Sequence, residues 1–70
     1  MIEIFKTNVQ NKTQAKRIVE ILQQGFAEAR INFDLADRDR ILRVDGISET
    51  GTKAIMNNLN RLGFRCEVLN

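Results

Sequence analysis

The residues best suited to chemistry lie in a short polar stretch between positions 8 and 14 and just after it. The stretch reads Asn-Val-Gln-Asn-Lys-Thr-Gln, and two further cations, Lys16 and Arg17, follow it. Amide and hydroxyl oxygens can cap the N–H groups at the start of a helix, and such a start can also hold a phosphate or carboxylate. We favour a helix cap beside a solvated basic face. The alternative is a site that engages an anion or a partner's backbone.

The cysteine and the aspartates do not form a second site. Cys66 is the single cysteine, so no internal disulfide can form, and one thiol alone is a poor metal site. We expect it to be a small buried residue on the inner face of the last strand. Asp37 and Asp39 alternate with arginine, and no calcium-binding loop pattern follows them. We therefore interpret residues 37–40 as a solvated hairpin turn.

The composition excludes several classes of catalyst. The chain has no histidine, which removes nucleophile–histidine pairs and histidine-ligated metals. No paired carboxylates, serine-based nucleophile site or glycine-rich phosphate loop can be assembled from its residues. We therefore predict no enzyme and no cofactor.

Length and charge indicate a small domain with a mixed surface. Seventy residues make one domain, 1–70, with a single core. Eleven basic residues against nine acidic ones give a net charge of +2, which is not typical of a polyanion-binding surface. No run approaches the roughly 20 apolar residues of a membrane span, and the first residues do not resemble a signal peptide. We expect a cytoplasmic location and no membrane partner.

Apolar periodicity predicts four strands and two helices. Strands are expected at residues 2–7, 26–35, 41–45 and 65–69, and helices between Asn11 and Gly25 and between Ser48 and Gly63. Asn11 with Gln14 has the layout of a capping box, and both glycines are expected just past a helix end. The order βαββαβ predicts an α+β ferredoxin-like sandwich. Its four-stranded antiparallel sheet would carry both helices on one face and leave the other face open.

The side of the sheet on which Phe5 lies is ambiguous. Ile2 and Ile4 share one face of the first strand, which puts Phe5 on the other. If Phe5 points outward, it forms an apolar spot with Ile41, beside Arg43, on the open sheet face. RNA-recognition domains stack bases on aromatic residues of this face. The third strand has no aromatic residue, so nucleic-acid binding through the open sheet face is a minor alternative.

The scaffold residues resemble those of a known family. The first helix carries Ile18 and Val19-Glu20-Ile21-Leu22 and ends in Gly25-Phe26. The alternating strand that follows carries Ala29, Ile31 and Phe33. The chain closes with Leu62-Gly63-Phe64-Arg65-Cys66 at the start of the last strand. This pattern resembles the heavy-metal-associated domain of copper chaperones and metal-transporting P-type ATPases over nearly the whole chain. In that family the first strand ends in Gly-Met-x-Cys-x-x-Cys, and a valine or isoleucine follows four residues after the second cysteine.

The resemblance also shows what this chain lacks. Alignment on Ile18 places the two metal cysteines of the family at Asn11 and Gln14, and its glycine and methionine at Asn8 and Val9. Cu(I) and Zn(II) in such a loop rely on soft thiolates, whereas Asn and Gln are neutral, hard and weak ligands. Lys12 adds an unfavourable positive charge. We therefore predict no metal ligands at these positions.

The leading hypothesis is a ligand-free relative of the metallochaperone domain that works as a protein-interaction module. The resemblance implies contacts through the first helix and first loop, where family members meet their partners. The residues expected there are Val9, Gln10, Lys12, Lys16, Arg17 and Phe64. The alternative is a heavy-metal binding or transport protein with unconventional ligands or ligands shared across a homodimer. The partner, the pathway and the oligomeric state stay open.

Overall fold

The strands and helices follow one another in the predicted order, βαββαβ. The structure, a computed structural model, describes residues 1–69, so Asn70 of the predicted domain lies outside the described residues. The elements are β1 (Ile2–Thr7), α1 (Lys12–Gly25), β2 (Arg30–Asp34), β3 (Ile41–Asp45), α2 (Glu49–Arg61) and β4 (Cys66–Val68). Two of the predicted strands, β1 and β3, have the predicted bounds.

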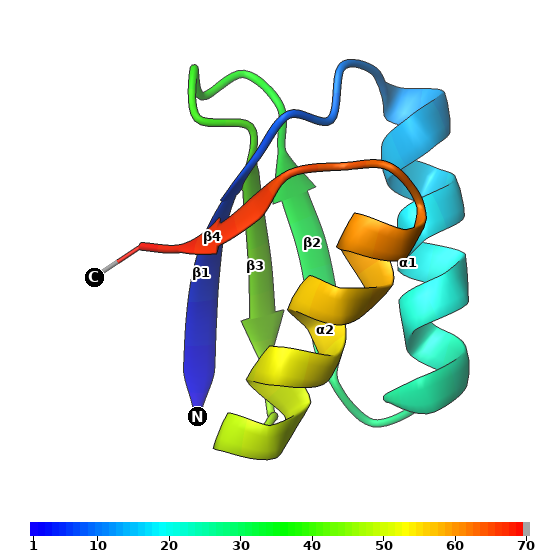
Figure 1. The fold of residues 1–70 in the computed structure, drawn as a ribbon, viewed down its shortest axis with the longest axis vertical. Helices are drawn as coiled ribbons and strands as arrows, with labels where there is room; N and C mark the ends of the chain where they lie inside the picture. Colours follow the sequence, from blue (N-terminus) through cyan, green and yellow to red (C-terminus); the bar gives the residue numbers. More distant parts are fainter. Residues whose placement is uncertain (70) are drawn as a thin grey trace.

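All four strands form one antiparallel sheet. Its order is β2-β3-β1-β4, and both helices lie together on one side of it (Figure 1). This confirms the predicted α+β ferredoxin-like fold. The two central strands, β1 and β3, pair with Phe5 opposite Leu42, and Phe5 also faces Val68 of β4. Residues that pair directly share a face, so this row lies beneath the helices.

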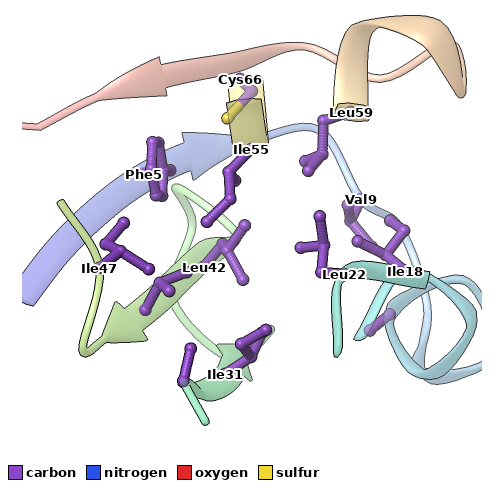
Figure 2. Close-up of a cluster of buried hydrophobic side chains, with 13 residues drawn as sticks. Phe5, Val9, Ile18, Leu22, Ile31, Leu42, Ile47, Ile55, Leu59 and Cys66 are labelled. Atoms are coloured by element: carbon purple, nitrogen blue, oxygen red, sulfur yellow. The ribbon is translucent and has the colours of Figure 1, made fainter. Parts of the chain in front are cut away.

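Phe5 belongs to the core, which settles the ambiguous face of β1. Its side chain is fully buried, and Figure 2 shows it in the same cluster as Leu42, Ile55 and Leu59. The condition for an apolar spot of Phe5 and Ile41 on the open face is therefore not met, and Ile4 lies on that face, opposite Arg43. Burial of a whole phenylalanine side chain stabilises a fold by about 1.5–3 kcal/mol, which favours the aromatic residue on the covered face.

The predicted start of β2 was four residues too early, because residues 26–29 form a turn. The N–H of Ala29 donates to the carbonyl of Phe26 at 3.1 Å, and the side-chain amide of Gln23 donates to both carbonyls, at 2.9 Å for Phe26 and 3.1 Å for Ala29. The ring of Phe26 packs against α2, where a Cβ on Gly51 would lie 3.3 Å from it. These contacts place Phe26 at a helix end rather than in a strand.

The two helices end differently, although a glycine was predicted just past the end of both. Gly63 has φ +91°, and the N–H groups of Gly63 and Phe64 donate to the carbonyls of Asn60 and Leu59 at 3.0 and 2.9 Å. This is the Schellman arrangement. Gly25 is instead the last residue of α1, and Phe26 is the cap. The prediction for Gly25 was therefore wrong. Neither helix in residues 1–69 has the length and apolar character needed to cross a bilayer.

Candidate functional site

The first loop begins α1 with a cap that differs in one bond from a standard capping box. Asn11 has extended backbone angles, φ −148° and ψ 168°, and its Oδ1 accepts the N–H of Gln14 at 2.9 Å. The Oε1 of Gln14 accepts the N–H of Gln10 at 2.9 Å rather than that of Asn11. Asn11 and Gln14 thus both accept hydrogen bonds from nearby backbone N–H groups, and the predicted cap at Asn11 is confirmed.

The same loop is fastened to two distant turns. The hydroxyl of Thr7 donates to the carbonyl of Arg40 at 2.6 Å, and the Arg40 guanidinium donates to the carbonyl of Gln10 at 3.1 Å. On the other side, Oδ1 of Asn8 accepts the N–H of Arg65 at 2.7 Å. The loop is therefore held between the β2–β3 hairpin and the turn that leads from α2 to β4. Sequence reasoning missed these contacts because the partners are 30 or more residues apart.

Arg40 has a strained, left-handed backbone conformation at this connection. Its φ of +47° is the one positive value at a non-glycine residue within residues 1–69. The N–H of Thr7 donates to the neighbouring carbonyl of Asp39 at 3.0 Å, so both carbonyls of the 39–40 segment face β1. A left-handed conformation at a non-glycine residue costs on the order of 1–3 kcal/mol and persists only where surrounding contacts hold it.

The donors at this loop do not suit a soft metal ion. Asn11 and Gln14 offer amide oxygens that already accept hydrogen bonds, and Lys12 between them carries a positive charge. Cys66 lies on the inner face of β4 beside Ile55 (Figure 2), and its burial raises the pKa of the thiol to about 11. Within the described part of the chain, no three Cys, Asp or Glu side chains gather closely enough to hold a metal ion.

The expected contact residues divide into exposed and buried members. Gln10, Lys12, Lys16 and Arg17 are exposed around the start of α1. Val9 is fully buried in the same cluster as Ile18 and Leu22, so it cannot meet a partner and its assignment as a contact was wrong. Its apolar side chain fills the space between the loop and the core. Phe64 is half-buried against the core, where it follows the Schellman turn.

A shallow apolar groove adjoins the exposed cations. It has a volume of about 230 Å³ and is lined by Lys12, Ala15, Phe33, Leu35 and Ala36. Lys16 lies one helical turn after Lys12 on the same side of α1, whereas Arg17 lies further round the helix. The first turn of α1 contains no acidic residue. The groove therefore has an apolar lining with one cation, Lys12, at its edge. In the sequence, Leu35 and Ala36, which follow β2, were the apolar residues that could have indicated it.

A second groove lies at the other end of the molecule. Its volume is about 360 Å³, and its lining is Met1, Glu3, Glu49, Thr52, Lys53, Met56 and Val68. Charges of both signs surround it, and none of the expected contact residues lines it.

The open sheet face lacks the feature that base stacking needs. The outer residues of the central strands are Ile2, Ile4 and Lys6 on β1 and Ile41, Arg43 and Asp45 on β3. Phe5, the aromatic residue of β1, is buried on the other face. No aromatic residue of these two strands therefore points outward, and stacking of bases on this face has no platform.

Protein-family models, characterised proteins and solved structures all gave no match to this chain. The resemblance to the heavy-metal-associated domain stays a prediction drawn from the sequence pattern.

Proposed function

We propose that this domain is a small, non-enzymatic protein-interaction module that uses the first loop and the adjoining side of α1. The observation that carries the proposal is the apolar groove beside the exposed cations Lys12 and Lys16. Its chemistry fits a partner segment that brings an apolar side chain to Ala15 and Phe33 and carboxylates to the two lysines. In this proposal the module is related to the metallochaperone domains that the sequence resembles, without their metal ligands.

The fastening of the loop supports this role. Arg40 and Asn8 tie the loop to its two neighbouring turns before any partner arrives. A surface that is already ordered loses less conformational entropy on binding, so more of the contact energy appears as affinity.

A cytoplasmic location is part of the proposal. The single thiol is buried and forms no internal disulfide, which fits a reducing compartment.

The test is affinity capture with three immobilised forms of the domain. These are the wild type, the double variant Lys12→Glu/Lys16→Glu, and Lys53→Glu, which reverses an exposed charge on α2. The proposal predicts that specific partners are retained by the wild type and by Lys53→Glu and are lost with the double variant. Equal retention by all three forms, each shown to be folded by circular dichroism, would place binding elsewhere and contradict the proposal.

A further inference from the structure

The strand β2 has an open edge. It lies at one end of the sheet, so within the described residues one side of its backbone faces no other strand (Figure 1). The strand is five residues long, and the chain has no proline that could block the edge. An exposed strand edge of this kind is a template for pairing with another strand, and its side chains decide which strand it accepts.

The side chains of β2 are complementary to the same strand read in the opposite direction. Arg30, Asn32 and Asp34 are exposed on the outer face, and Ile31 and Phe33 lie on the inner face. An antiparallel pairing about Asn32 brings Arg30 opposite Asp34 of a second copy twice, once at each end. It also brings Ile31 opposite Phe33 and Asn32 opposite itself. Opposite charges and apolar pairs at directly facing positions stabilise a sheet.

Other registers of the same pairing are disfavoured. A shift by one residue sets the apolar inner positions against the polar outer ones. A shift by two residues loses both Arg30–Asp34 pairs, and a shift by four opposes Arg30 to Arg30 or Asp34 to Asp34. A parallel, in-register pairing also opposes like charges along the strand. The side chains of β2 therefore favour one antiparallel register of self-pairing and disfavour the shifted registers and the parallel pairing.

We propose that the domain forms a homodimer in which β2 pairs with β2 of a second copy, antiparallel about Asn32. The two four-stranded sheets then continue into one sheet of eight strands, with the helices of both copies on the same side. The inference does not depend on the proposed function, because it is argued from the strand edge and its charges, although both surfaces include Phe33. A contact limited to one short edge belongs to the weak interfaces, which bury less than about 1,200 Å². We therefore expect a reversible dimer that forms at high protein concentration and weakens with salt.

The test is sedimentation velocity over a series from low micromolar to millimolar protein. In a dimer of Arg30→Asp chains, the carboxylate at position 30 would face Asp34 of the other copy at both ends of the interface. In a dimer of Asp34→Arg chains, two guanidinium groups would face each other at both ends. Each single variant should remain monomeric where the wild type dimerises. An equimolar mixture of the two variants should dimerise again, because one acidic edge then meets one basic edge. Arg65→Asp, which changes the same charge beside β4 at the other end of the sheet, should behave as the wild type.

Folding of the variants is controlled separately. Arg30 lies opposite Asp45 within the sheet, and Oδ1 of Asp34 accepts the N–H of Ala36 at 3.2 Å, so both reversals cost some stability. If either reversal unfolds the chain, the milder pair Arg30→Gln and Asp34→Asn replaces it. Each of these should weaken dimerisation, and mixing them should restore it only in part, because the mixed dimer keeps one of the two Arg30–Asp34 pairs.

Three results would overturn the proposal. The first is a wild type that stays monomeric over the whole concentration series. The second is self-association of folded single variants to the same extent as the wild type. The third is a mixture of folded Arg30→Asp and Asp34→Arg chains that remains monomeric.

Discussion

The side chain of Gln14 reaches back past the helix cap and accepts the N–H of Gln10 at 2.9 Å. In a standard capping box this side chain would accept the N–H of Asn11, so here the cap extends one residue further back into the loop. The carbonyl of the same Gln10 accepts a hydrogen bond from the Arg40 guanidinium. Gln10 therefore joins the helix start to the β2–β3 hairpin, and the order of the first loop depends on both contacts.

Removal of the cap should destabilise the domain. Replacing Asn11 by Ala is expected to lower the free energy of unfolding by about 1 kcal/mol, because the N–H of Gln14 loses its acceptor. Asn11→Asp should keep or raise stability, since α1 has no acidic residue in its first turn and a carboxylate there interacts favourably with the helix dipole. Urea unfolding measured by circular dichroism checks both, with Thr13→Ala as an exposed control in the same turn. A loss for Thr13→Ala equal to that for Asn11→Ala would argue against the cap.

The face of β1 that carries Phe5 can be tested with its neighbour. Phe5→Ala should cost about 3–5 kcal/mol, because it leaves a cavity in the core. Ile4→Ala, one residue away on the open face, should cost clearly less, since Ile4 is only half-buried. The two free energies of unfolding are compared in urea. A larger loss for Ile4→Ala than for Phe5→Ala would mean that the strand is turned over.

The two helix-end glycines should respond oppositely to alanine. Gly63→Ala is expected to lower stability by about 1 kcal/mol, because φ +91° is unfavourable for a residue with a Cβ. Gly25→Ala should raise stability by up to about 1 kcal/mol, since Gly25 is helical and a Cβ there meets nothing within 4 Å. Thermal and urea unfolding check the signs. Destabilisation by Gly25→Ala would instead indicate that Gly25 lies past the helix end in a left-handed conformation.

The buried thiol makes stability depend on alkaline pH. Burial raises the pKa of Cys66 from 9.0 to about 11, so above pH 9 the thiol ionises in the unfolded chain before it does in the folded one. The unfolded state then binds fewer protons than the native state, and stability should fall as pH rises from about 9 toward 11. Denaturant titrations of the wild type and Cys66→Ala measure the difference between their pH profiles. Identical slopes in this range would contradict a buried, protonated thiol.

Two cysteines in place of Asn11 and Gln14 should give the domain a Cu(I)-binding site. The double variant Asn11→Cys/Gln14→Cys should bind one equivalent of Cu(I) under reducing conditions, because it supplies two thiolates at the start of α1. The wild type should not compete with a Cu(I) chelator. Tight binding by the wild type, with chemical-shift changes at residues 8–14, would favour the alternative of a metal-binding protein. No gain by the double variant would mean that the loop geometry differs from that of the family.

Much of the fold follows from local pattern, and the exceptions have physical reasons. The caps at Asn11 and Ser48 and the Schellman glycine Gly63 were predictable because each depends on residues within one or two turns. The face of Phe5 was not, since apolar side chains occur on both sides of β1 and only the helices above decide between them.

The site was less predictable than the fold. The cations at the start of α1 could be read from the sequence, but the burial of Val9 and the bonds from Thr7 to Arg40 and from Asn8 to Arg65 depend on tertiary contact. The partners in these bonds are separated by 33 and 57 positions along the chain. Local periodicity carries no information about such pairs.

The most direct test of the interaction surface is chemical-shift mapping of the isotope-labelled domain with a captured partner. The largest changes are expected at Gln10, Lys12, Ala15 and Lys16. Binding should weaken at least tenfold, or about 1.4 kcal/mol, with Lys12→Glu/Lys16→Glu and stay unchanged with Lys53→Glu. Changes confined to the open sheet face around Ile4 and Arg43, with affinity unaffected by the double variant, would contradict it.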